Sequence, residues 1–244
     1  RVSLYERSDH LGGQYRLAAL GTCKQELTRV IQYLERGARR AGVEVHLQTE
    51  VGPQQLQEGA FEVLVVATGS EPCRPEWGDP SGHPEWSGTS GCSSRGTSGS
   101  EVSCALDVLS GLAPRPAGRV LIAGGGTVGC ELAELLAMDS TAVTLVEARE
   151  GVGLEMFSEA RTLLLERLRS RGVTILTSTT IEGLGPEGVI VRDAAGRRTL
   201  SGFDAVVLAL GARPLDRLSA AARELGLEVH VIGDARRPRQ ALEA

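Results

Sequence analysis

The sequence has 244 residues, a formal net charge of −5 and a hydrophobic content of 41% with 31 glycines, which suits a globular α/β protein of one large or two ordinary domains. The negative charge argues against nucleic acid or an anionic membrane as the main partner. No apolar run approaches the roughly 20 residues of a membrane span, and no signal peptide is recognised, so a cytoplasmic protein is expected.

The chain begins with a short apolar strand, Val2 to Glu6, that ends in an acid. Such a strand is typical of the second strand of a dinucleotide-binding fold. Position 1 is not a methionine, and no strand or glycine-rich turn precedes Val2. We therefore expect the first strand and its glycine fingerprint to lie upstream, in a longer protein. An ordinary edge strand at an N-terminus is the alternative.

A tight loop follows at Leu11-Gly12-Gly13-Gln14, where the backbone is expected to contact a ligand; Gln14 as a merely exposed side chain is the alternative. Apolar residues at helical spacing predict an amphipathic helix from Lys24 to Ala41, which Gly42 ends. Val43 to Leu47 is predicted to be a strand. Val63 to Ala67 has the continuous apolar character of a buried parallel strand, and it ends in Thr68-Gly69-Ser70.

The composition changes between Glu71 and about Ser100, where Pro, Gly and Ser dominate. We interpret residues 78–100 as a linker or flexible insertion. Trp77 and Trp86 lie in or beside it, and packing of this loop onto the surface is favoured over stacking on a ligand. Ala105 to Gly111 is predicted to be a short helix.

The most informative segment is Val120 to Glu147. An apolar strand leads into Gly124-x-Gly126-x-x-Gly129, a helical pattern follows, and a second strand ends in Glu147. In a dinucleotide-binding turn the first glycine allows the tight turn, the second admits a pyrophosphate, and the third lets the helix pack closely. The free N–H groups at the start of the helix, around Thr127 and Val128, then face the phosphates.

This pattern leaves two questions open. A glycine-rich turn that binds nothing is the alternative to a dinucleotide site, although the flanking strands and the acid make the pattern specific. Glu147 favours NAD(H), because a carboxylate accepts hydrogen bonds from a ribose 2′-hydroxyl and repels a 2′-phosphate. Arg149 lies close enough in sequence to attract such a phosphate, so NADP(H) also stays open.

The remaining pattern continues an α/β fold. A helix capped by Ser158 is predicted to run to Arg171, and Val173 to Leu176 is predicted to be a strand. A hairpin is expected around residues 189–200. Further predicted elements are a buried strand at Ala205 to Ala209 ending in Leu210-Gly211, a helix at Asp216 to Leu225, and a last strand at Leu227 to Ile232 that leads into Gly233-Asp234.

Taken in order, these segments resemble the two-dinucleotide-binding flavoprotein fold of the pyridine nucleotide–disulphide oxidoreductases. More narrowly they resemble the C-terminal half of the 2,4-dienoyl-CoA reductase and trimethylamine dehydrogenase group, whose N-terminal half is a barrel of the old-yellow-enzyme type. The resemblance implies an FAD segment at Tyr5-Glu6-Arg7, Gly12, Gly13 and Gln14, a turn against FAD at Ala67-Thr68-Gly69, and an NAD(P)H site at Gly124 to Gly129. It also implies that the carboxylate of Gly233-Asp234 binds the ribityl or ribose part of FAD.

The resemblance and the local patterns together predict two Rossmann-like lobes. Residues 1–114 and 214–244 would form a split, incomplete FAD-binding lobe, and residues 115–213 would form an NAD(P)-binding lobe inserted between its halves. The cofactor-binding candidates are Glu6, Arg7, Gly12, Gly13, Gln14, Ala67, Thr68, Gly69, Gly124, Gly126, Thr127, Val128, Gly129, Glu147, Gly211, Gly233 and Asp234.

The predicted function is hydride transfer from NAD(P)H to FAD in a flavin oxidoreductase, with no catalytic acid, base or metal ligand assigned. A preceding barrel domain would carry an iron–sulfur cluster and FMN if they are present. A nucleotide-binding module or truncated remnant without functional flavin is the alternative, since the FAD glycine fingerprint is absent from this sequence. A disulphide reductase is disfavoured, because the five cysteines are scattered and none form a C-x-x-C or C-x-x-x-x-C pair.

Overall fold

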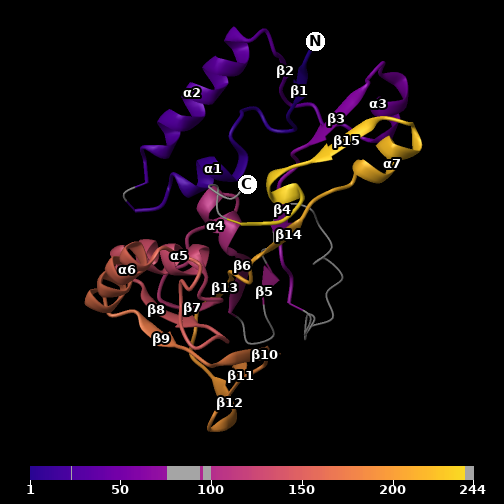
Figure 1. Ribbon diagram of the computed structural model, residues 1–244. Helices are drawn as coiled ribbons and strands as arrows, with labels where there is room; N and C mark the ends of the chain where they lie inside the picture. Colours follow the sequence, from indigo (N-terminus) through magenta and orange to yellow (C-terminus); the bar gives the residue numbers. More distant parts are fainter. Residues whose placement is uncertain (23, 76–93, 96–99, 240–244) are drawn as a thin grey trace. The chain divides into compact units, whose positions relative to one another are not determined.

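A computed structural model describes residues 1–22, 24–75, 94–95 and 100–239 (Figure 1). The predicted insertion, with Trp77 and Trp86, lies almost entirely outside these residues. The chain divides into a first unit, Arg1–Glu71 with Ala212–Ala244, and a second unit, Pro72–Gly211. One unit is therefore inserted into the other. Both units contain helices and parallel strands, which confirms the predicted α/β fold.

The two compact units differ from the predicted lobes in where residues 72–114 belong. We expected this segment in the first lobe, but it lies in the second unit. The reason is strand pairing: β6 (Glu101–Cys104) runs parallel to β13 (Ala205–Leu208), which in turn pairs with β7 (Arg119–Ala123). The composition of the segment before β6 indicated a linker. The sequence pattern therefore did not predict the short strand Ser94–Arg95, which pairs with β6 in the larger sheet.

The second unit is built on a six-stranded sheet in the order β5-β6-β13-β7-β8-β9. The strands not yet defined are β5 (Ser94–Arg95), β8 (Ala142–Val146) and β9 (Thr174–Leu176). All neighbours are parallel except β5, which is antiparallel to β6. Every residue of β13 is buried, as expected for a central parallel strand that is covered on both faces.

Different layers cover the two faces of this sheet (Figure 1). Helices α4 (Ala105–Ser110), α5 (Thr127–Met138) and α6 (Ser158–Ser170) pack on the face that includes Ile122, Leu145 and Val207. An antiparallel sheet of β10 (Thr180–Gly185), β11 (Gly188–Asp193) and β12 (Gly196–Leu200) packs on the other face. The predicted hairpin at residues 189–200 is confirmed as β11 and β12.

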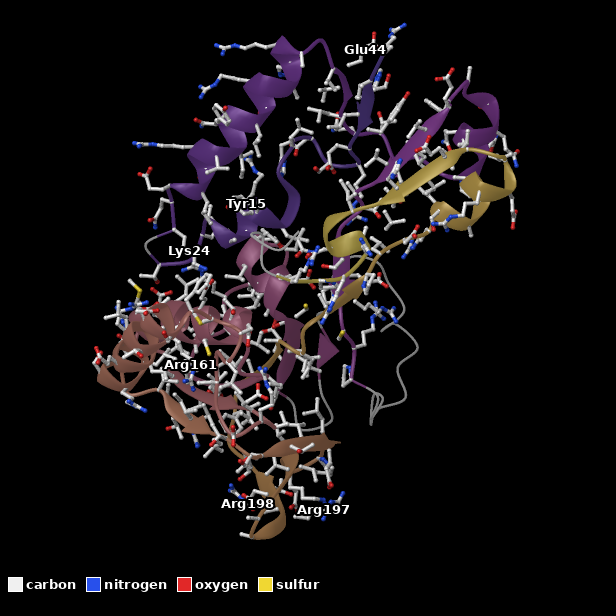
Figure 2. All side chains as sticks on the ribbon, viewed as in Figure 1. Tyr15, Lys24, Glu44, Arg161, Arg197 and Arg198 are labelled. Atoms are coloured by element: carbon white, nitrogen blue, oxygen red, sulfur yellow. The ribbon has the colours of Figure 1, made fainter. Side chains whose placement is uncertain are left out.

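Ion pairs hold parts of the second unit together. Glu134 of α5 has only 1% of its surface exposed, and its carboxylate accepts hydrogen bonds from Arg167 and Arg171 at the end of α6. At the surface, Arg197 and Arg198 extend from β12 and pair with Glu182 and Asp193 respectively (Figure 2). The first network links two helices, whereas the second pairs are solvated and contribute little.

Two details of the helices correct or explain the sequence pattern. Ser158 does not cap α6: Phe157 holds the N-cap position, and the Ser158 hydroxyl donates to the Glu159 carboxylate instead. The segment after α5 lacks the glycine that usually ends such a helix, and Ser140 takes its place with a φ of 62°. A left-handed serine there costs energy that glycine would not.

The first unit contains two separate pairs of parallel strands and a small core. β1 (Ser3–Tyr5) pairs with β2 (Glu44–His46), and β3 (Val63–Val66) pairs with β15 (Glu228–Val231). β4 (Ser70–Pro72) and β14 (Ala212–Pro214) form another pair. The helical elements are α1 (Gly13–Ala18), α2 (Leu27–Arg40), α3 (Pro53–Glu58), α7 (Ser219–Glu224) and the 3-10 turn η2 (Gly233–Ala235).

The predicted burial of β3 on both faces is wrong. Val66 is buried, but Val63 and Val65 are 48% and 53% exposed. Only one face of the two-stranded pair packs on the core of this unit, which includes Leu56 and Ala222. The apolar stripe of α2 is similarly incomplete, because Ile31 is its only buried residue.

Candidate cofactor site

The glycine turn of the second unit has the backbone geometry that the sequence predicts. Gly124 has a φ of 105°, and a Cβ on it would meet the carbonyl oxygen of Ala209 at 2.3 Å. A Cβ on Gly129 would lie 1.9 Å from the carbonyl oxygen of Gly124. Both positions therefore require glycine, one for the turn and its contact with β13, the other for close packing of α5.

Gly126 differs from these two glycines. It is the N-cap of α5 with a φ of −70° and a ψ of −176°, a conformation open to any residue. A Cβ there would meet only the Glu155 carboxylate, with its Oε1 at 2.9 Å. Backbone strain therefore does not require a glycine at position 126. The missing side chain leaves open space beside the backbone, which a turn that admits a phosphate requires.

Glu147 lies beside this turn, at the end of β8. Its Oε2 accepts the N–H of Gly125 at 2.7 Å, and its Oε1 accepts the N–H of Arg149 at 2.8 Å. Burial opposes ionisation of Glu147, but these N–H donors and the Arg149 side chain outweigh it, so the pKa of Glu147 is lowered. The structure therefore joins the acid to the glycine turn, and an ionised carboxylate keeps lone pairs for a ribose hydroxyl.

Arg149 is held between two acids. Its Nε donates to Glu147 at 3.2 Å, and its Nη2 lies 3.4 Å from the Oε2 of Glu155. The hydrogen bond to Glu147 raises the pKa of the Arg149 guanidinium further. Its positive charge is therefore already balanced within the protein.

Glu155 occupies the start of α5. Its Oε1 accepts hydrogen bonds from the Thr127 N–H and, at 3.1 Å, from the Thr127 hydroxyl. Burial works against ionisation of Glu155, yet the Thr127 donors and Arg149 more than compensate, and its pKa is lowered. No sequence pattern indicates this residue, because no spacing rule links it to the glycine turn.

In the first unit, three segments far apart in sequence meet through one hydrogen-bonded set. The Gln14 amide donates to the Ser70 carbonyl and hydroxyl oxygens, both at 2.9 Å. The Ser70 hydroxyl donates to Asp234 Oδ2 at 3.2 Å, and the Arg239 N–H donates to Asp234 Oδ1 at 3.2 Å. Ser70 was not among our candidates, although it directly follows Thr68-Gly69 and so could have been found from that turn.

The other candidates of the first unit surround this set less directly. Thr68 donates its hydroxyl to the Leu215 carbonyl oxygen, and Gly69 accepts the Leu215 N–H at 3.0 Å. Glu6 accepts the N–H and hydroxyl of Ser8, both at 2.9 Å. The rest have no side chain that closes the site: Arg7 and Ala67 are exposed, Gly12 is the N-cap of α1 with Gly13 after it, and Gly233 has a positive φ. The candidate Gly211 also has a positive φ, but it is the last residue of the second unit.

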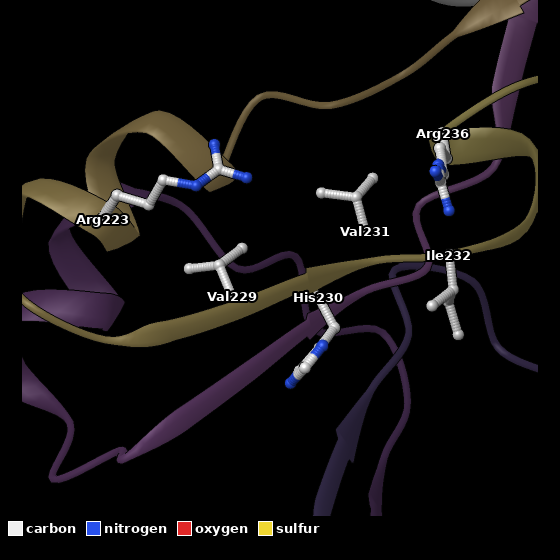
Figure 3. A pocket seen from close by; sticks show the side chains of 6 residues that line it. All are labelled: Arg223, Val229, His230, Val231, Ile232 and Arg236. Carbon is white, nitrogen blue, oxygen red and sulfur yellow. The ribbon is translucent and has the colours of Figure 1, made fainter.

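A shallow hollow of the first unit does not coincide with these residues. It is lined by Arg223, Val229, His230, Val231, Ile232 and Arg236, so it follows β15 and includes no candidate residue (Figure 3). Figure 3 shows Val229 and Val231 on one side of the strand with Arg223, and His230 and Ile232 on the other. The strand itself therefore divides this lining, which does not form one enclosed site.

The cysteines of the described residues do not offer a reactive thiol near the glycine turn. Cys130 of α5 is 1% exposed, and its Sγ lies 3.3 Å from the carbonyl oxygen of Gly125. Burial, with nearby acids including Glu155, raises the pKa of the Cys130 thiol to about 12. The thiol is therefore protonated at neutral pH and inert as a nucleophile.

Both sets of residues fit the cofactors that the sequence predicts. The second unit offers a bare glycine turn at the start of a twelve-residue helix with an ionised acid beside it, which suits a dinucleotide. The first unit gathers Gln14, Ser70 and Asp234, an amide, a hydroxyl and a carboxylate that suit a hydroxyl-rich ligand, beside the open backbone of Gly69 and Gly233.

Comparison with known proteins agrees with this geometry. Residues 40–236 match the family described as pyridine nucleotide-disulphide oxidoreductase. The sequence is 29% identical to a metal reductase of Desulforamulus reducens and 30% identical to an NADH oxidase of Thermoanaerobacter brockii. The matches cover 100% and 96% of this chain but only 39% and 34% of the relatives, so the chain spans little more than a third of their length.

Solved structures show the same fold. A 2-naphthoyl-CoA reductase in complex with 2-naphthoyl-CoA superposes with a TM-score of 0.82 at 24% identity, covering 98% of this chain and 34% of that one. Histamine dehydrogenase from Rhizobium sp. 4-9 gives a TM-score of 0.77 at 20% identity, with 98% and 38% covered. These matches confirm the resemblance stated from the sequence. Among the described residues, no helix is long and apolar enough to cross a membrane.

Proposed function

This chain belongs to the pyridine nucleotide–disulphide oxidoreductase family, and we propose that it binds NAD(P)H on the second unit and FAD on the first. The observation that carries the proposal is the glycine turn at the start of α5. Gly126 is bare without backbone strain, and the buried carboxylate of Glu147 is hydrogen bonded to the same turn. A turn that bound nothing would need neither feature.

The bound cofactors would supply the chemistry, a hydride transfer from the nicotinamide to the flavin. The chain's own residues bind and orient. The N–H groups at the start of α5 would face the pyrophosphate of NAD(P)H, and Glu147 would accept a ribose hydroxyl. Asp234, Ser70 and Gln14 would hold hydroxyl groups of FAD. No proton transfer is needed for this step, and we assign no general acid or base.

We further propose that NADH is preferred to NADPH. Glu147 is ionised and buried at the place where the 2′-position of the adenosine ribose would lie, so a 2′-phosphate would be repelled. Arg149, the cation nearest to it in sequence, is already paired with Glu147 and Glu155. Its charge is therefore only partly available to a phosphate.

The module would act within a longer protein, as its share of the relatives' length suggests. Those relatives carry names with different acceptors, a metal reductase and an NADH oxidase, so the final acceptor here is not fixed by kinship. Following the resemblance, a preceding barrel with an iron–sulfur cluster and FMN would receive the electrons. A cytoplasmic location stays a prediction of the sequence.

Anaerobic titration tests the proposal. The protein reconstituted with FAD should show the visible flavin absorbance, and NADH should bleach it. The matched variants are Gly126→Val, which should keep the flavin colour but lose bleaching at low NADH, and Asp234→Ala, which should lose flavin. A flavin-loaded protein that NADH does not bleach would refute the proposed function.

A second candidate is a nucleotide-binding module without flavin. The contacts that favour it are unequal between the two units: Glu147 completes a glycine turn at a helix start in the second unit, whereas the candidates of the first unit form the smaller set of Gln14, Ser70 and Asp234. In that case the protein would remain colourless after reconstitution and would still bind NADH. The same titration therefore separates the two candidates.

A further inference from the structure

We propose that the Glu155 carboxylate is a built-in competitor of the cofactor's pyrophosphate, and that it sets how tightly NAD(P)H binds. This inference rests on the proposed NAD(P)H site. It concerns a residue of the loop after β8 that no fingerprint of the fold specifies. The dinucleotide would have to displace Glu155 from the start of α5 before its phosphates could reach the helix.

The contacts show an anion already in place. Glu155 Oε1 accepts the N–H and the hydroxyl of Thr127, the first residue of α5. The N-cap residue Gly126 has no side chain that could accept these donors. A carboxylate from a residue far along the chain therefore satisfies the helix start, where the partial positive charge of the helix favours an anion.

The position of this carboxylate is the one that the bare turn leaves open. A Cβ on Gly126 would lie 2.9 Å from Glu155 Oε1, so the oxygen takes the space that a side chain would take. The glycine keeps this space free for a phosphate. One N–H and one hydroxyl of Thr127 cannot serve the carboxylate and a phosphate oxygen at full strength together, so the two anions compete.

The Glu155 carboxylate can move away from the start of α5, because its side chain is partly exposed to solvent. Its side chain is 39% exposed, and one further partner is Arg149, which is 47% exposed. When the dinucleotide displaces the carboxylate, Arg149 loses one of its two acids and keeps Glu147. The N–H donors of Arg149 that Glu155 released can then bind the incoming phosphates. Displacement therefore replaces the Glu155 carboxylate beside Arg149 with a phosphate of the cofactor.

Direct binding measurements test this inference without flavin or turnover. Calorimetry or NADH fluorescence should give a Kd for NADH that is about two- to tenfold lower in Glu155→Ala, because charge at a helix start has an effect of that order. ADP-ribose should gain by the same factor, and adenosine, which has no phosphate, should gain nothing. Glu150→Ala is the matched control, since it removes an equally charged, exposed side chain of the same loop and should leave the Kd nearly unchanged.

A second variant guards against misfolding. Glu155→Gln keeps an oxygen that can accept the Thr127 N–H but loses the charge, so its gain in affinity should be smaller than that of the alanine variant. If Glu155→Ala fails to fold by circular dichroism, the glutamine variant decides the question.

The outcomes separate this inference from the proposed function. If the wild type binds NADH and both Glu155 variants bind it with the same Kd, the proposed competition by Glu155 is refuted and the proposed NAD(P)H site is not. Weaker binding in the variants overturns it as well, since Glu155 would then help to hold the ligand. A gain for adenosine equal to that for ADP-ribose also overturns it. Wild-type and variant proteins that all fail to bind NADH overturn the site and the competitor together.

Discussion

The carbonyl oxygen of Gly124 lies 1.9 Å from the place where a Cβ of Gly129 would be. Gly129→Ala must therefore push α5 away from the strand that precedes it, and we expect a loss of about 3 kcal/mol in the free energy of unfolding. Gly126→Ala has no such conflict, because its backbone is extended and its Cβ would meet only the movable end of Glu155.

The same pair of glycines separates folding from binding. Gly126→Ala should unfold in urea within about 0.5 kcal/mol of the wild type, as ordinary substitutions away from tight packing do. Its Kd for NADH should nevertheless rise about tenfold, because the methyl group enters the space for phosphate. Equal affinity in this variant and the wild type would contradict the assigned phosphate position.

In the buried ion network between α5 and α6, removing the arginines should lower the free energy of unfolding more than removing Glu134. Replacing both Arg167 and Arg171 with methionine leaves the Glu134 carboxylate buried without its partners, and we expect a loss of about 3–5 kcal/mol. Glu134→Leu leaves two arginines that are 39% and 28% exposed and can turn to water, so the loss should be about 1 kcal/mol. Urea unfolding of both variants measures the difference; equal losses would show that burial of Glu134 is not the governing factor.

Cys130 should make stability depend on pH in the alkaline range. Its pKa is raised to about 12 in the folded protein, so the unfolded thiol ionises first as the pH rises. The resulting contribution is fully present below the ordinary thiol pKa of about 8.5 and falls by about 1.4 kcal/mol per pH unit above it, until about pH 12.

Cys130→Ala serves as the control for this titration, because it removes the thiol and keeps the other alkaline groups. Between pH 8 and pH 10 the wild type should lose about 2 kcal/mol more than the variant in urea unfolding. Parallel losses in the two proteins would show that the thiol does not titrate in this way.

Glu147 should govern the choice between NADH and NADPH. Glu147→Ser removes the carboxylate that would repel a 2′-phosphate and frees Arg149 from one of its acids. The ratio of the Kd for NADPH to the Kd for NADH should fall about tenfold, the equivalent of one charge interaction of about 1.4 kcal/mol. Glu147→Asp keeps the charge and should keep most of the preference. An unchanged ratio in the serine variant would place the ribose elsewhere.

Asp234 should govern flavin retention in the first unit. Its carboxylate joins Ser70 and lies at η2, and hydrogen bonds to a charged acceptor contribute about 1.5–3 kcal/mol. Asp234→Ala should therefore raise the Kd for FAD about ten- to a hundredfold. Glu228→Ala, which removes an exposed acid of the adjacent strand β15, should not change it. Flavin content after gel filtration measures both.

The sequence predicted local elements well because each has a local cause. Apolar periodicity on both sides of three glycines predicts β7, α5 and β8. The flanking strands and helix identify the turn more reliably than the three glycines alone. A second G-x-G-x-x-G occurs at Gly183 to Gly188, yet it forms the end of β10, the turn and the start of β11. There the strand on each side is antiparallel, and no helix follows.

What the sequence could not predict depends on partners far along the chain. The Glu155 carboxylate reaches Thr127 across a loop with no repeating pattern, and Ser70 joins Gln14 and Asp234 only because the fold brings three segments together. The exposure of Val63 depends on what packs on that face of β3, which the apolar run itself does not encode. The assignment of residues 72–114 was likewise decided by the pairing of β6 with β13.

The inserted unit begins and ends at one place. The N–H of Cys73 donates to the carbonyl oxygen of Gly211 at 2.9 Å, so the incoming and outgoing chain of this unit run side by side where it opens. An excised segment would thus have its two ends already in register, and a few glycines could close it into a ring. We expect such a segment to fold when it is expressed by itself or inserted into a loop of an unrelated host, because its two ends already lie together.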